Sequence, residues 1–165
     1  MNLREVFDKR KSMRKFTGEP ITEEQLKLIM EAAQIAPSGS NKQPYKFIVI
    51  KNDELKKELR KLAVPQRFVM KAAVIFVVLG DKELSPYFYK VDIGIAVQQM
   101  ALQAAELGLG SCWLGAFDRD KTKDFLRVPN PWAVVALLLV GIPDEIPPDR
   151  PRKSLDELFV NDSFQ

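Results

Sequence analysis

The stretch VDIGIAVQQMALQAAEL, residues 91–107, contains the strongest structural pattern in this sequence. One set of apolar side chains recurs every three or four residues, as on one face of a helix: Ile93, Val97, Met100, Ala104 and Leu107. A second set occupies much of the remaining surface: Val91, Ile95, Ala101, Leu102 and Ala105. A helix that is apolar around most of its circumference is buried on most sides. We therefore expect a long, nearly buried helix that ends at Gly108.

Strands are expected on both sides of this helix in the sequence. Residues 73–79 and 133–140 are apolar throughout, which is typical of strands in the middle of a sheet. Residues 45–51 predict a third strand, and residues 111–116 a short strand or extended segment. Helices and strands alternate without a strict strand–helix–strand rhythm. The order predicts an α+β fold, or a three-layer α/β sandwich, in a single domain over residues 1–165.

Two capping boxes predict where further helices begin. Thr22 can accept a hydrogen bond from the amide of Gln25, whose side chain can reach back, and Ser154 and Glu157 repeat the pattern near the end of the chain. The helix that begins after Thr22 should end before Pro37.

Weaker patterns predict three more helices and one irregular stretch. Short helices are expected over residues 3–9 and 121–126, and a charged surface helix should bury one apolar face. That face comprises Leu55, Leu59 and Leu62. Prolines between residues 143 and 151 exclude regular structure up to Arg152.

The composition excludes several classes of site. The chain has no histidine and a single cysteine, Cys112. Catalytic triads, Cys-rich metal sites and most zinc sites are therefore excluded, and we expect no metal. The first residues lack the apolar segment of a signal peptide, and no apolar run is long enough to cross a membrane. We expect a cytoplasmic protein with no membrane contact.

A compact run of positive charge lies near the N-terminus. Arg10, Lys11, Ser12 and Arg14 place three cations and a hydroxyl within five residues. Arginine forks match phosphate oxygens in pairs, and serine adds a neutral donor. The rest of the chain is slightly acidic, which favours a compact anion site over a nucleic-acid-binding face. A solvated surface run is the alternative.

Two loops could approach a flat ligand. Residues 36–45 place small polar and amide side chains between two prolines, and could recognise a planar heterocycle or form an ordinary polar loop. In residues 108–116, Gly108, Gly110 and Gly115 permit close backbone approach. Their spacing is not the phosphate fingerprint of dinucleotide-binding folds. Cys112 has no histidine to activate it, so we expect it to be a buried apolar residue.

These segments, in this order, resemble the nitroreductase family of FMN-dependent oxidoreductases. The matching segments are residues 10–16, 36–45, 73–78, 91–94, 108–117 and 152–157. No single motif is specific, but the ordered set is. The resemblance implies a three-layer α/β sandwich with a mostly antiparallel central sheet flanked by helices. It also implies a homodimer with two FMN sites, each built from both chains.

The resemblance implies roles for individual residues. The phosphate and ribityl chain of FMN would be held by Arg10, Lys11, Ser12 and Arg14, with Arg152 or Lys153 closing on the phosphate. The isoalloxazine ring would be lined by Pro37, Ser38, Gly39, Asn41 and Gln43 of the partner subunit. Leu114 and Gly115 would present backbone near the reactive edge of the flavin. Arg67 would place a positive charge near the pyrimidine end and favour the anionic reduced ring.

The reaction implied by the resemblance needs no histidine. NAD(P)H would deliver hydride to FMN, and a small oxidised substrate such as a nitroaromatic or a quinone would then take the electrons in a ping-pong cycle. No catalytic protein side chain is expected. Only eleven residues separate the strand ending at Leu79 from the helix at Val91, so any lid over the substrate is small. Two alternatives stay open: a non-catalytic FMN-binding protein, and a small nucleic-acid-binding domain.

Overall fold

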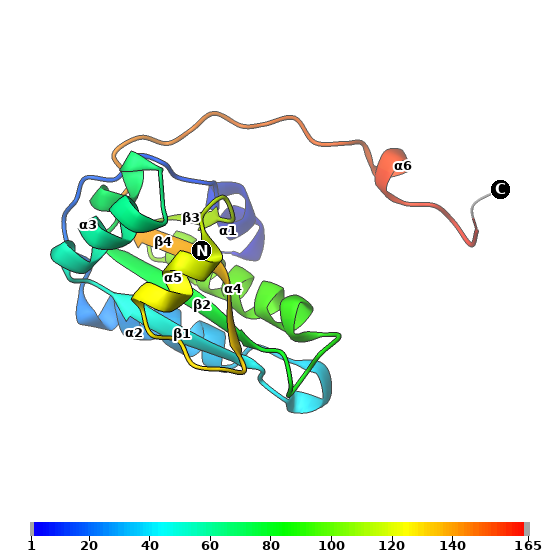
Figure 1. Ribbon diagram of the computed structural model, residues 1–165. Coiled ribbons are helices and arrows are strands. Elements are labelled where there is room, and N and C mark those ends of the chain that lie inside the picture. The colour runs from blue at the N-terminus through cyan, green and yellow to red at the C-terminus, as the bar shows by residue number, and fades with distance from the viewer. Residues whose placement is uncertain (1, 164–165) are drawn as a thin grey trace.

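The computed structural model describes residues 2–163 and has the layered α/β architecture expected from the sequence (Figure 1). The strands are β1 (Tyr45–Ile50), β2 (Val74–Asp81), β3 (Gly110–Leu114) and β4 (Trp132–Gly141). The α-helices are α1 (Leu3–Lys9), α2 (Glu23–Gln34), α3 (Asp53–Leu62), α4 (Tyr89–Glu106), α5 (Arg119–Phe125) and α6 (Leu155–Leu158). Two short 3₁₀ turns, η1 (Gly39–Asn41) and η2 (Arg67–Lys71), complete the order. Most predicted elements are present, with ends shifted by a few residues.

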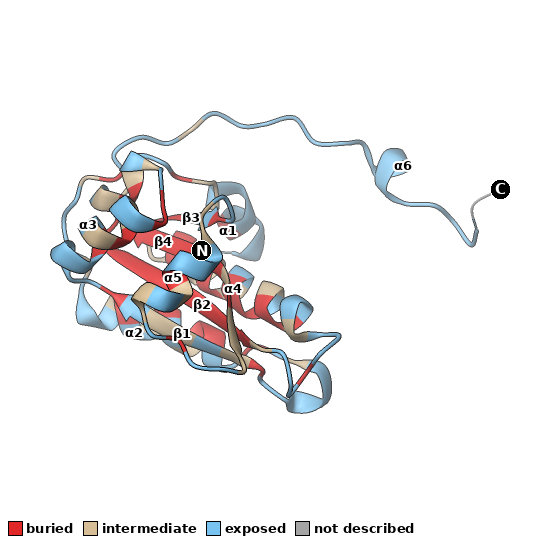
Figure 2. Ribbon diagram, viewed as in Figure 1, coloured by how far each residue is buried: buried red, intermediate tan, exposed pale blue. Residues whose placement is uncertain are grey.

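The four described strands form one antiparallel sheet in the order β1-β2-β4-β3. Side chains of β2 alternate between two cores, because successive residues of a strand point to opposite faces. Phe76 and Val78 pack with α2 and α4, whereas Ile75 and Val77 face the side of α3. The buried strands β2 and β4 therefore form the middle layer of a three-layer sandwich (Figure 2).

Helix α4 is buried on most of its surface but not on all of it. It starts at Tyr89, two residues before the predicted start, and Gly108 adopts the expected left-handed conformation after its end. Val91 and Ile95 are 53% and 37% exposed. The prediction of nearly complete burial is therefore wrong for the isolated chain. An apolar edge of α4 remains in contact with solvent.

The apolar face predicted for α3 is also wrong in part. Leu59 is fully buried, but Leu55 and Leu62 are 45% and 43% exposed. Lys56 is buried in their place, and its Nζ atom donates to the carbonyl oxygen of Ala72 (3.0 Å) and pairs with Asp53 (3.0 Å). A lysine can bury its aliphatic stem when a polar partner receives its ammonium group, which a simple apolar pattern does not reveal.

The capping boxes at Thr22 and Ser154 are both formed, so these two predictions are confirmed. Beyond Pro143, which forms an isolated bridge with Phe16, the chain is irregular up to α6, as the prolines predict. The end of this segment, which carries α6, extends away from the rest of the molecule (Figure 1). Apolar side chains are exposed on it: Leu155, Leu158, Phe159 and Val160.

Candidate functional site

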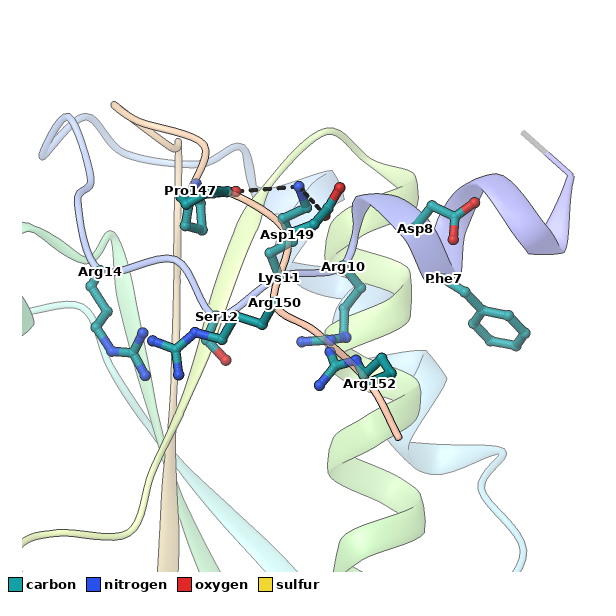
Figure 3. A pocket seen from close by; sticks show the side chains of 11 residues that line it. Phe7, Asp8, Arg10, Lys11, Ser12, Arg14, Pro147, Asp149, Arg150 and Arg152 are labelled. Carbon is teal, nitrogen blue, oxygen red and sulfur yellow. Dashed lines mark hydrogen bonds and ion pairs between the residues drawn. The ribbon is translucent and has the colours of Figure 1, made fainter. Parts of the chain in front are cut away.

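A basic pocket of about 560 Å³ lies between the segment after α1 and the proline-rich tail (Figure 3). The first segment supplies Arg10, Lys11, Ser12 and Arg14, and the tail supplies Arg150 and Arg152. The fold thus brings together cations that are more than 130 residues apart in the sequence. The remaining lining residues are Phe7, Asp8, Pro147, Pro148 and Asp149.

The basic segment is positioned by strand β3. The amide of Met13 donates to the carbonyl oxygen of Ser111 (2.9 Å), and Ser12 forms a bridge with Ser111. Met13 packs directly on Gly110, where a Cβ atom would lie 2.7 Å from the Met13 Cγ atom. Gly110 therefore makes room for Met13 rather than for a flat ligand, which corrects one expectation from the glycine pattern. Burial of Met13 leaves its neighbours Ser12 and Arg14 facing the pocket.

Lys11 differs from the other cations of the pocket. Its ammonium group pairs with Asp149 (2.6 Å) and donates to the carbonyl oxygen of Pro147 (3.2 Å), as the dashed lines in Figure 3 show. This lysine therefore ties the tail to the basic segment. Its contact also keeps the pKa of Asp149 below the ordinary value, because the carboxylate accepts a hydrogen bond from the Lys11 cation.

The arginines of the pocket have no carboxylate partner within the part of the chain that the structure describes: Arg10, Arg14, Arg150 and Arg152. Asp8 also lines the pocket, but its carboxylate pairs with Arg4 (3.2 Å). Four guanidinium groups around one hollow, with the Ser12 hydroxyl beside them, form a donor set suited to a phosphate dianion. Sequence reasoning did not name Arg150 as a site residue, although its position two residues before Arg152 was a signal. Lys153 does not line the pocket.

The loop of residues 37–43 is unusual in its backbone. Ser40, Asn41 and Gln43 all have positive φ angles, between 48° and 55°. Such conformations are uncommon for residues with a side chain. Short-range hydrogen bonds hold the loop: the Ser38 Oγ atom accepts from the amide of Gln43 (2.9 Å), and the Gln43 side chain donates to the carbonyl oxygen of Asn41 (3.0 Å). These hydrogen bonds give the loop a defined conformation.

This loop does not contribute to the basic pocket of its own chain. None of its residues lines the pocket, and η1, the cyan turn at the lower right of Figure 1, lies well away from α1. The residues predicted to hold the two ends of FMN are therefore not brought together within one chain.

The segment after β3 presents backbone to solvent beside a polar side chain. Leu114 is buried in the strand, whereas Gly115 and Ala116 are exposed. The Gln66 side-chain nitrogen donates to the carbonyl oxygen of Ala116 (2.8 Å), and its Oε1 atom is buried without a partner. Sequence reasoning named Arg67, which is exposed at the start of η2, and missed Gln66. Gln66 therefore holds the segment after β3 in place, through a contact that exists only in the folded chain.

Cys112 is buried in β3, as predicted. Burial raises the pKa of its thiol, and the positive charge of Arg14 offsets this only in part. The described residues contain no group of three or more potential metal-binding acids or cysteines. Within the same range, no helix is long and apolar enough to span a bilayer.

Comparisons with known proteins agree with this architecture. The model of the nitroreductase family matches residues 8–69 and 63–142. A putative NADH dehydrogenase/NAD(P)H nitroreductase of Archaeoglobus fulgidus is 31% identical over 143 residues, which cover 82% of each protein.

Solved structures extend the likeness to almost the whole chain. A nitroreductase family protein from Clostridium difficile 630 has a TM-score of 0.89 and 30% identity, with 99% of this chain and 100% of that chain covered. The NADPH:FMN oxidoreductase from Vibrio harveyi, solved in complex with NAD⁺, has a TM-score of 0.91 and 28% identity, and covers 100% of this chain and 79% of its own. On the matched family model and the identity to these relatives, the chain belongs to the nitroreductase family.

Proposed function

We propose that this chain is an FMN-dependent oxidoreductase that uses NAD(P)H as its electron donor and reduces a small oxidised substrate. The observation that carries the proposal is the basic pocket, which is lined by the Ser12 side chain and by four arginines that have no carboxylate partner among residues 2–163. Relatives named NADPH-flavin oxidoreductase and FMN reductase (NADPH) support the same activity.

The residues of this chain fit FMN at two points. The terminal phosphate would be held by Arg10, Ser12, Arg14 and Arg152, with Arg150 as an additional cation. Lys11 would act mainly by holding the tail that carries Arg150 and Arg152 in place. At the other end, the exposed backbone of Gly115 would lie beside the ring, and Gln66 would fix this segment through its hydrogen bond to the carbonyl oxygen of Ala116. Arg67 and Lys153 remain candidates for weaker electrostatic contacts.

The site would be completed by a second copy of the chain. None of the residues predicted to line the ring lines the basic pocket of its own chain: Pro37, Ser38, Gly39, Asn41 and Gln43. A homodimer would bring this loop to the flavin of the partner. The apolar edge of α4 at Val91 and Ile95, and the exposed apolar side chains of the tail, supply surface for such an interface.

FMN, when bound, supplies the hydride chemistry, which no protein side chain provides. The chain would hold the phosphate by charge, present the ring through the neutral donors and acceptors of the 37–43 loop, and exclude water by dimerisation. The acceptor would be small, because only a short connection between β2 and α4 is available to cover it. Nitroaromatics and quinones fit this description.

The proposal is tested with the purified protein. We expect flavin absorbance in the visible region, or its appearance on addition of FMN, and anaerobic bleaching on titration with NADH or NADPH. A protein that does not quench FMN fluorescence contradicts the flavin assignment. Flavin binding without reduction by either nicotinamide would support a non-catalytic flavin-binding protein instead.

A further inference from the structure

Asp92, in the first turn of α4, is the one buried acidic side chain in the described range 2–163, with 1% of its surface exposed. Its Oδ1 atom accepts a hydrogen bond from the backbone amide of Gly39 (2.9 Å). Its Oδ2 atom is also buried and has no hydrogen-bond partner among these residues. A buried carboxylate is costly unless donors satisfy it, so the burial of Asp92 calls for an explanation.

The Gly39 amide belongs to the loop in which three non-glycine residues have positive φ angles. Two further contacts hold the loop at its ends. Lys42 donates to the carbonyl oxygen of Leu84 (3.1 Å), and the Tyr45 hydroxyl donates to the carbonyl oxygen of Ala36 (3.3 Å). Burial raises the pKa of Tyr45, and the nearby negative charge of Asp92 adds to this effect. The carboxylate therefore lies where the loop, α4 and β1 meet.

Among these contacts, only the one between Asp92 and Gly39 joins the loop to α4. A hydrogen bond to an ionised acceptor is stronger than one between neutral groups. An ideal Cβ atom on Gly39 would lie 3.8 and 3.9 Å from the two Asp92 oxygens, so this part of the loop is in van der Waals reach of the carboxylate. The exposed residues Val91 and Ile95 belong to the same helical turns. The shape of the loop is thus tied to the helix face that we assign to the dimer interface.

We propose that Asp92 is a positioning residue for flavin binding: through Gly39 it holds the 38–43 loop in the shape that accepts the isoalloxazine ring of the partner subunit's FMN. This inference rests on the function proposed above. The carboxylate does not touch the phosphate pocket, so its effect should be on binding of the ring alone.

The test compares FMN with riboflavin, which has the same ring and no phosphate, by quenching of flavin fluorescence. Asp92→Ala should weaken both ligands about tenfold or more and leave the ratio of their affinities unchanged, because the loop contact is lost while the phosphate contacts remain. The flavin affinities of Asp92→Asn should lie between those of Asp92→Ala and wild type, because the amide oxygen of asparagine can still accept a hydrogen bond from the Gly39 amide. Glu106→Gln, an exposed change on the same helix, is the matched control and should bind like wild type.

A second measurement reports on the loop directly. Amide hydrogen exchange in residues 38–43 should accelerate in Asp92→Ala, while exchange in β4 stays as in wild type. If Asp92→Ala does not fold, Asp92→Leu, which keeps the number and branching of the side-chain heavy atoms and removes the acceptor, takes its place.

The outcomes separate this inference from the proposed function. A wild type that binds neither flavin overturns the proposed function, and with it this role of Asp92. A wild type that binds both, with a folded Asp92→Ala variant of equal affinity, overturns only the inference. A loss of FMN affinity alone would also overturn it, since that pattern reports on the phosphate.

Discussion

The Nζ atom of Lys11 lies 2.6 Å from the Oδ1 atom of Asp149, and this contact joins the segment that carries Arg10 and Arg14 to the tail that carries Arg150 and Arg152. Residues at opposite ends of the chain form one anion pocket only while the tail keeps this position. The geometry of the pocket therefore depends on an ion pair at its edge as well as on the arginines that line it.

This ion pair should be visible in the titration of Asp149. The hydrogen bond and charge of Lys11, together with the charge of Arg152, hold the pKa of this carboxyl below its ordinary value of 3.8. Because folding lowers this pKa, the stabilisation from the contact is fully present above the ordinary pKa. It is lost as the pH falls through the lowered pKa. An NMR titration of the carboxyl carbon should give a midpoint below 3.8, and Lys11→Met should raise it. If Lys11→Met leaves the midpoint unchanged, the pair is not formed in solution. Because Asp149 is exposed, Asp149→Asn should hardly change the melting temperature.

Replacing Arg14 with alanine should weaken FMN far more than riboflavin, which lacks the phosphate. A hydrogen bond to a charged group contributes about 1.5–3 kcal/mol, which corresponds to a loss of roughly ten- to a hundredfold in FMN affinity. The fold should be unaffected, because Arg14 is exposed. Lys61→Ala removes one exposed positive charge outside the pocket and serves as the control. Equal losses for both ligands would mean that Arg14 shapes the site in general, and no loss would mean that the cluster is a solvated surface run.

A charge introduced on the exposed apolar edge of α4 should prevent dimerisation. The same change should abolish tight flavin binding. Ile95 is partly exposed in the single chain and would be covered in the dimer. Ile95→Asp would bury an unpaired carboxylate at the interface, which is strongly unfavourable. Sedimentation should show a monomer whose far-ultraviolet circular dichroism matches that of wild type. Tight FMN binding by that monomer would contradict the two-chain site.

Cys112 should be inert in the folded protein. Its thiol is buried and its pKa is raised by that burial, so little thiolate is present at neutral pH. A thiol reagent should react with it only after addition of denaturant. Cys112→Ala should cost about 1 kcal/mol in stability and retain FMN binding and turnover. Rapid modification of the native protein, or loss of turnover in a folded Cys112→Ala variant, would assign the cysteine a role in the reaction.

Truncation of Phe76 should destabilise the whole domain. This side chain is fully buried in β2, between the sheet and α4. Phe76→Ala should lower the free energy of unfolding by about 3–5 kcal/mol, since it removes a large apolar group and leaves a cavity. Denaturant unfolding measures the change. Tyr87→Ala, at a position that is 92% exposed, is the comparison and should alter stability by less than about 0.5 kcal/mol.

Local patterns in the sequence were sufficient for most elements of the fold. Strands β2 and β4 are apolar along their lengths, and Thr22 and Ser154 begin capping boxes, so each of these features depends on neighbours in the chain. The same holds for the burial of Cys112 and the left-handed Gly108. Family membership also followed from the order of short motifs and is confirmed by the comparisons.

Contacts between distant segments could not be predicted in this way. The burial of Lys56 depends on the carbonyl group of Ala72, and Gly110 is occupied by Met13 from a different part of the chain. The partnership of Arg150 with the basic segment, the unpartnered oxygen of Gln66 and the hold of Asp92 on Gly39 likewise exist only after folding. Spacing and propensity describe what a residue does with its near neighbours, whereas these interactions depend on which surfaces meet when the layers pack.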